Sequence, residues 1–166
     1  MMAGVMNTSA RSYANVNARL KGLEANGSVT VRSPLSIAGD LSYVRGTMTS
    51  QAVLGITATD LAETPPLRTR LRARLDGRWF AELEGVASAS QTHVDETLGE
   101  TPTPSYAIAN LTGGLRRGRF AAAIGVSKRF HQYFVEHLSY QRDPYRSGVR
   151  VAEPGRNLFT NVSCKF

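Results

Sequence analysis

The side chains best suited to chemistry in this sequence are three histidines, His93, His131 and His137. They fall in long polar stretches that also carry acids, namely Asp95, Glu96 and Glu136. The spacing of His131 and His137 does not match a zinc pattern, and Cys164 is the only cysteine. We therefore predict surface-loop histidines without a ligand role, no metal site and no cofactor. The alternative is capture of copper or another metal by an external loop, which would use His137 and Met48.

Other catalytic arrangements are not indicated. The glycine pair Gly113-Gly114 lies inside an alternating segment and is not followed by a helix, so it does not predict a phosphate-binding loop. The sequence places no Ser/His/Asp set in an identifiable cleft. We expect a protein that is not an enzyme.

The strongest chemical pattern is a stripe of arginines facing a stripe of glutamates. Arg68, Arg70, Arg72 and Arg74 alternate with mostly aliphatic residues up to Leu75, and Glu82 and Glu84 alternate with Trp79, Ala81 and Leu83 on the next segment. Directly opposite residues of a hairpin share a face, and a one-residue slip would mix the faces. A three-residue turn, Asp76 to Arg78, sets Arg72 opposite Glu82 and Arg70 opposite Glu84. The pattern predicts an ion-pair ladder of Arg70, Arg72, Glu82 and Glu84 on one wall.

This ladder bears on the meaning of the formal charge of +7. Exposed arginines could bind phosphates of a nucleic acid, but such a patch usually carries aromatic residues for stacking. Here the arginine strand has no interleaved aromatic, and its arginines face acids. We favour a hydrated lumen wall and no nucleic-acid partner, and we rank an Arg-rich soluble nucleic-acid binder lowest.

About seven alternating segments are predicted as antiparallel strands. They are Ala18 to Val31, Leu35 to Thr47, Leu67 to Leu75, Trp79 to Ser90, Tyr106 to Leu115, Phe120 to Val126 and the last ten residues. Short turns at residues 32–34, 76–78 and 116–118 alternate with long connections at about 50–65, 91–104 and 128–155. Short turns on one side and long loops on the other are typical of outer-membrane barrels. Residues 130–138 could hold a short helix.

The last ten residues alternate up to a terminal aromatic. Leu158, Thr160, Val162, Cys164 and Phe166 share one face, and the other face is polar apart from Phe159. The final residues of a soluble domain usually fray in water. In a membrane barrel the apolar face contacts lipid and a terminal aromatic lies in the interfacial girdle.

Two features of the sequence limit the class of membrane protein that it can form. The sequence contains no run of about 18 apolar residues, so it predicts no transmembrane helix. The first ten residues lack the basic start, apolar core and cleavage site of a signal peptide. We expect residues 1–12 to be disordered and residues 13–166 to form the barrel part. Either the chain is not exported or it is a piece of something longer.

The sequence resembles the C-terminal barrel portion of TonB-dependent outer-membrane receptors. The likeness is carried by residues 15–24, 41–46, 65–71, 100–106 and 136–159 in that order. The resemblance implies a barrel of about twenty-two strands around a plug domain, which imports siderophores, cobalamin or metal complexes using the TonB system. It also implies that the barrel-assembly machinery reads Leu158, Val162, Cys164 and Phe166, although Cys164 stands where an aromatic is more usual.

Two departures from that family are visible. The usual Asn-Leu-Phe-Asp run is replaced by residues 127–131, which keep only the Phe. No plug, TonB-contact segment or signal peptide is recognisable, and about fifteen strands are missing. An open strand edge cannot be satisfied by lipid, so we expect that this chain does not transport alone.

The sequence therefore predicts an all-β fold, an antiparallel transmembrane β-barrel segment with open edges. The predicted function is a fragment of an outer-membrane uptake receptor that supplies barrel wall and external loops, with outer-membrane lipid and the assembly machinery as partners. The alternative is a complete small outer-membrane barrel or a β-sandwich that acts as a binding module, with an eighth strand in residues 3–13.

Overall fold

One long antiparallel sheet dominates the computed structural model, which describes residues 15–55, 57–127, 134–143, 146–150 and 152–165. Its seven strands lie in the order β1-β2-β3-β4-β5-β6-β9. Their bounds are β1 Ala18–Arg32, β2 Leu35–Met48, β3 Arg68–Leu75, β4 Trp79–Ser88, β5 Tyr106–Arg117, β6 Phe120–Ser127 and β9 Asn157–Cys164. The predicted strands are thus confirmed, with ends that differ by a few residues. The N-terminal segment lies outside the described residues up to residue 14.

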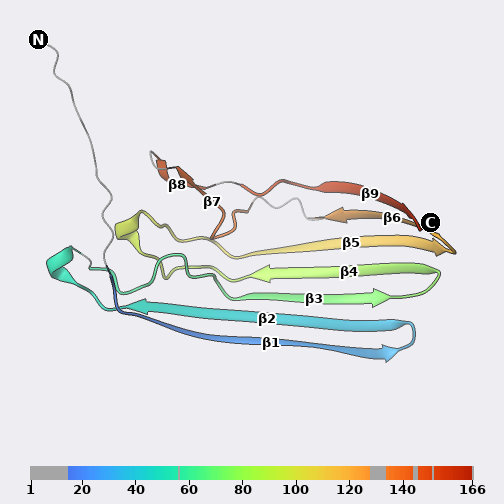
Figure 1. Ribbon diagram of the computed structural model, residues 1–166, viewed down its shortest axis with the longest axis horizontal. Coiled ribbons are helices and arrows are strands. Elements are labelled where there is room, and N and C mark those ends of the chain that lie inside the picture. The colour runs from blue at the N-terminus through green and yellow to red at the C-terminus, as the bar shows by residue number, and fades with distance from the viewer. Residues whose placement is uncertain (1–14, 56, 128–133, 144–145, 151, 166) are drawn as a thin grey trace, which may run out of the picture.

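The connections alternate between short and long, as the sequence predicts. Figure 1 shows tight turns at one end of the sheet and the long connections gathered at the other. The first turn contains a cis Ser33–Pro34 bond, and the turn after β5 places Gly118 at a φ of 58°, a conformation that suits glycine. We call the two ends of the sheet the turn end and the loop end.

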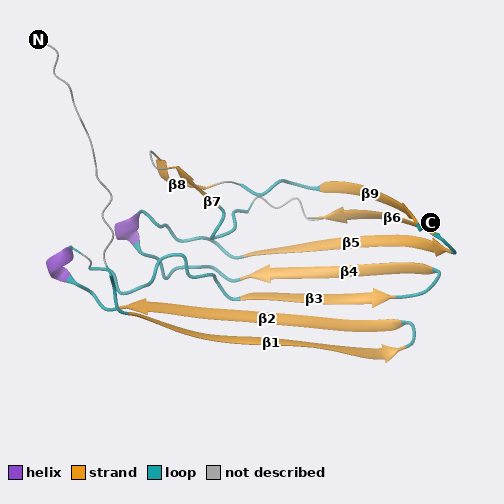
Figure 2. Ribbon diagram, in the orientation of Figure 1, coloured by secondary structure: helices purple, strands orange, loops and turns teal. Residues whose placement is uncertain are grey.

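Small elements occur within the long connections (Figure 2). The first two hold single-turn 3-10 helices, η1 Ala52–Leu54 and η2 Glu96–Leu98, and the third holds the hairpin of β7 Tyr140–Asp143 and β8 Arg146–Arg150. The alternation of the sequence did not predict this hairpin. The short helix suggested for residues 130–138 falls partly outside the described residues, and residues 134–138 are not helical. No helix in the described part of the chain is long and apolar enough to cross a membrane.

Each strand of the sheet presents an apolar side and a polar side. We define the apolar face by the large side chains that the register brings together, which are Leu23, Val29, Ile37, Tyr43, Leu71, Leu75, Trp79, Leu83, Leu111, Ile124, Leu158 and Val162. The polar face carries Asn26, Ser28, Asp40, Arg70, Arg72, Arg74, Glu82, Glu84, Asn110, Thr112 and Asn161. The sheet therefore has the two-sided pattern of a strand with period two.

In the middle strands of the sheet, the burial of the two faces is the reverse of that in a soluble protein, whereas β1 and β9 are exposed on both faces. Leu71 is 63% exposed and Leu83 is 50% exposed, whereas the side chain of Glu84 on the polar face is only 22% exposed. Buried hydrophobic side chains among the described residues are limited to Val86, Val94, Tyr106 and Phe134. A water-soluble sheet would cover its leucines with a second layer. This sheet leaves them open and packs its polar side chains against one another.

The sheet is open within the described residues. β1 and β9 each pair with one neighbour and form the two edges. The described strands therefore form neither the closed small barrel nor the sandwich of the alternative prediction.

Candidate functional site

The arginine–glutamate ladder lies on the polar face, but its register differs from the prediction by two residues. Arg72 is opposite Glu84 and Arg74 is opposite Glu82, because Leu75 pairs with Ala81 and not with Trp79. A slip of two residues keeps every side chain on its face. The prediction of the shared face is confirmed, but both predicted cross-strand positions, Arg72 opposite Glu82 and Arg70 opposite Glu84, are wrong, since Arg70 is opposite Val86.

The ion pairs follow the observed register and its diagonals. Arg74 donates to Glu82 at 2.9 Å, and Arg70 lies 3.8 Å from both Glu84 and Asp40. The Nε atoms of Arg70 and Arg72 are buried and have no hydrogen-bond partner among the described residues. The ladder thus forms a charged wall in which Arg74, absent from the predicted set, makes the shortest arginine–glutamate contact.

At the turn end, Asp76 joins two strands of the polar face. It accepts hydrogen bonds from Arg74 at 2.7 Å and from Arg116 at 3.1 Å. These bonds, first from Arg74 and then from Arg116, hold the pKa of the Asp76 carboxyl below its ordinary value. The Arg116 guanidinium also lies 4.4 Å from the centre of the Phe80 ring. Phe80 in turn covers Gly114, where a Cβ would collide with the ring. These contacts of Asp76 and Phe80 link β3, β4 and β5 at the turn end.

At the loop end, a buried polar cluster ties the three long connections together. Glu100 accepts from the backbone N–H of Glu63 at 2.9 Å and of Asp95 at 2.8 Å, and its Oε1 lies 2.9 Å from His137 Nε2. The other ring nitrogen of His137 lies 3.0 Å from Thr103 Oγ1. Since these residues come from all three connections, we call the set Glu63, Asp95, Glu100, Thr103 and His137 the loop cluster.

Local features of the chain help to build this cluster. Asp95 is 2% exposed and caps η2 by accepting from the Thr97 N–H at 2.9 Å. The helix ends at Gly99, whose φ of 77° is easily adopted by glycine. This compact turn brings the Glu100 carboxylate within hydrogen-bond distance of the Asp95 backbone. The segment Asp95 to Gly99 carries the signal of a capped turn, but nothing in the sequence indicates its contact with His137.

A second set of contacts fixes the third connection against the polar face. The rings of Phe134 and Tyr106 stack with centroids 4.2 Å apart, and the Tyr106 hydroxyl donates to Glu136 at 3.1 Å. Glu136 also lies 3.6 Å from Arg68 on β3. The connection is therefore held next to the first rows of the charged wall.

The histidines do not share one environment. His93 is exposed, as predicted, whereas His137 is 4% exposed, so its prediction as a surface-loop residue is wrong. His131 lies outside the described residues. No group of three or more potential metal ligands occurs within the described ranges. Both His137 nitrogens contact oxygen atoms of the loop cluster.

The predicted assembly signal lies on the edge strand β9. Leu158, Val162 and Cys164 share the apolar face and are exposed, and Val162 is 77% exposed. Phe166 lies outside the described residues. Phe159 points to the polar face, where its ring covers Gly125 of β6, since a Cβ there would collide with the ring. This contact explains the one aromatic exception on the polar side of the terminal strand.

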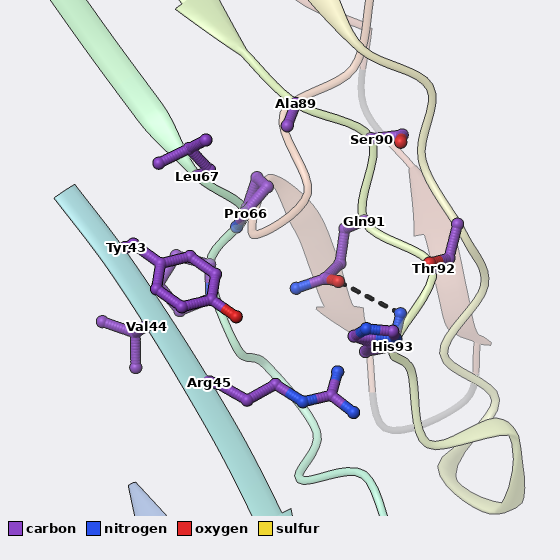
Figure 3. A pocket seen from close by; sticks show the side chains of 11 residues that line it. Tyr43, Val44, Arg45, Pro66, Leu67, Ala89, Ser90, Gln91, Thr92 and His93 are labelled. Atoms are coloured by element: carbon purple, nitrogen blue, oxygen red, sulfur yellow. Dashed lines mark hydrogen bonds between the residues drawn. The ribbon is translucent and has the colours of Figure 1, made fainter. Parts of the chain in front are cut away.

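A cleft of about 140 Å³ lies at the loop end, between β2 and the connection that follows β4 (Figure 3). We call it the loop-end cleft; its lining includes Tyr43, Arg45, Leu67, Ala89, Gln91 and His93. Gln91 donates to the Thr64 carbonyl at 2.7 Å and closes one side. By strand alternation, Tyr43, Arg45 and Leu67 belong to the apolar face. The cleft thus lies where the apolar face meets the loops.

A single antiparallel sheet with an exposed apolar face, a half-buried charged face, and long loops at one end has the arrangement of the wall of a transmembrane β-barrel. Solved structures have the same arrangement. The copper transporter OprC matches with 24% sequence identity and a TM-score of 0.78, over 92% of this chain and 25% of its own. The ferric-catecholate import receptor Fiu from E. coli K12 matches with 15% identity and a TM-score of 0.66, over 96% of this chain and 23% of its own.

The sheet therefore has the fold of a TonB-dependent receptor barrel. The chain spans about a quarter of the length of each of these two structures. No family model matches the sequence, and no curated protein matches it.

Proposed function

We propose that this chain supplies a section of barrel wall and external loops to an outer-membrane uptake receptor. The observation that carries the proposal is the reversed burial of the sheet, in which Leu83 is half exposed and the neighbouring Glu84 side chain is mostly covered. Exposed leucines are favourable in hydrocarbon, and charged side chains are favourable in a hydrated lumen. The likeness of the sheet to transporter barrels supports the same orientation.

The two edges of the sheet define what else the receptor needs. Unpaired backbone groups of β1 and β9 cannot be satisfied by lipid, so further strands must close the barrel. In the full-length receptor the TonB system would power import, and the assembly machinery would read Leu158, Val162, Cys164 and Phe166 on the terminal strand. The chain itself has a structural role in this proposal and no catalytic one.

The proposed ligand class is a scarce metal-containing nutrient, such as a siderophore complex, cobalamin or another metal complex. The loop cluster supports a role in ligand admission, because Glu100 and His137 join three connections into one buried network. Such a network would give the external loops a fixed shape beside the charged wall. His137 acts here as a loop contact, so the loops would shape the entrance without ligating the metal.

Flotation with phosphatidylcholine vesicles tests the membrane orientation. The full chain should float with the vesicles through its exposed apolar face and show a β-sheet circular dichroism spectrum. Replacing Leu71, Leu83 and Leu111 by serine should abolish flotation, because all three lie exposed on the apolar face. The matched control, Thr112→Ala on the polar face, should float as the unmodified chain does. A folded chain that stays in the aqueous fraction would contradict the proposal.

A further inference from the structure

The loop-end cleft combines a basic side chain with both apolar and polar side chains. Figure 3 shows the Arg45 side chain extending from β2 toward the segment that carries His93, with the Tyr43 ring beside it. Arg45 Nη2 lies 2.7 Å from Asp60 Oδ1. Its Nη1 atom is buried and has no hydrogen-bond partner among the described residues. One side of this guanidinium is thus paired with an acid, the other side has a donor without a described partner, and the side chain as a whole is 29% exposed and lines the cleft.

Further cations lie on the same face. Lys21 is directly opposite Arg45 in the register of β1 and β2, and Arg19 follows two residues earlier on β1. Both are exposed. Like charges directly opposite one another in a sheet are unfavourable unless an anion lies between them. Asp60 is paired with Arg45, and no described ion pair neutralises Lys21 or Arg19.

We infer that the loop-end cleft binds the phosphate of a membrane lipid whose headgroup is anionic. Guanidinium and ammonium donors recognise phosphate, and arginine can do so with two parallel hydrogen bonds. The inference rests on the proposed function, because the apolar face must contact hydrocarbon for a lipid to reach the cleft. Tyr43 and Leu67 at the cleft are 43% and 39% exposed and would lie beside the upper part of the acyl chains. A free phosphate ion would leave these side chains in water, so the structure favours a lipid.

Native mass spectrometry of the full chain in detergent tests this inference. The chain is mixed with phosphatidic acid or with phosphatidylcholine of the same acyl chains, and the fraction that retains a lipid is measured. We expect phosphatidic acid to be retained about fivefold more than phosphatidylcholine, as a basic cluster at a membrane surface would give. The double variant Lys21→Gln, Arg45→Gln should lose this preference.

The control variant is Arg117→Gln, which removes an exposed cation of the apolar face at the turn end. It should keep the preference, so an equal loss in this variant would overturn the cleft as the site. If loss of the Asp60 contact unfolds the double variant, the exposed pair Arg19→Gln, Lys21→Gln carries the test. Equal retention of both lipids by the unmodified chain, or displacement of phosphatidic acid by excess inorganic phosphate, would overturn the inference.

The flotation assay separates this inference from the proposed function. A chain that floats with phosphatidylcholine vesicles but shows no lipid preference contradicts only the phosphate site. A chain that does not float contradicts the membrane orientation itself.

Discussion

The loop cluster makes a specific prediction about Glu100, which is 8% exposed and accepts hydrogen bonds from two backbone amides, those of Glu63 and Asp95. Glu100→Ala removes both acceptors and also the contact with His137. A hydrogen bond to a charged acceptor contributes about 1.5 to 3 kcal/mol. Each of the two amides should therefore exchange its hydrogen about 10- to 150-fold faster in the variant, if its exchange requires the loops to open.

Hydrogen exchange of the detergent-solubilised chain, resolved to single amides or short peptides, measures this effect. The matched control is Glu96→Ala, which removes an exposed acid from the same turn. It should leave exchange at Glu63 and Asp95 close to that of the unmodified chain. Amides in the middle of β3 should be unaffected by either substitution. Unchanged exchange at both Glu63 and Asp95 in Glu100→Ala would show that Glu100 does not tie the connections together.

Two further predictions concern the faces of the sheet. Leu83→Arg places a charge on the apolar face and should destabilise the membrane-inserted chain by about 2 to 4 kcal/mol near the bilayer midplane; Thr112→Arg on the polar face should cost much less in the same denaturant titration. Gly125→Ala should destabilise the sheet by about 1 to 3 kcal/mol because the new methyl group collides with the Phe159 ring. Gly85→Ala is its control, since a Cβ there meets nothing within 4 Å, and equal melting of the two variants would contradict the packing.

The strands and faces of this fold could be predicted because the alternation of apolar and polar residues determines them locally. The register could not be predicted to the residue. A shift of two positions preserves both faces, so the pattern from Leu67 to Ser90 is equally compatible with Leu75 opposite Trp79 or opposite Ala81. In the observed register Trp79 and Phe80 extend beyond the end of β3 and pair with Leu115 and Gly114 of β5, which the pattern of the hairpin alone does not indicate.

The loop cluster could not be predicted from the sequence for a different reason. Glu100 and His137 are far apart in the chain and have no periodic context, so only the folded connections bring them together. The capped turn from Asp95 to Gly99 was a local signal that could have been recognised. The burial of His137 was not predicted, because its acidic neighbour Glu136 indicated a solvated loop. The partners of His137 in the structure are Glu100 and Thr103.

The orientation of the apolar face can be tested most directly through Trp79, the single tryptophan of the chain, which is 71% exposed on that face. In vesicles whose acyl chains carry bromine, its fluorescence should be strongly quenched. The double variant Trp79→Phe, Phe80→Trp moves the reporter by one residue to the polar face, and its fluorescence should be quenched by aqueous acrylamide and little by bromine. Equal bromine quenching of the two proteins, or none in the unmodified chain, would contradict a lipid-facing leucine surface.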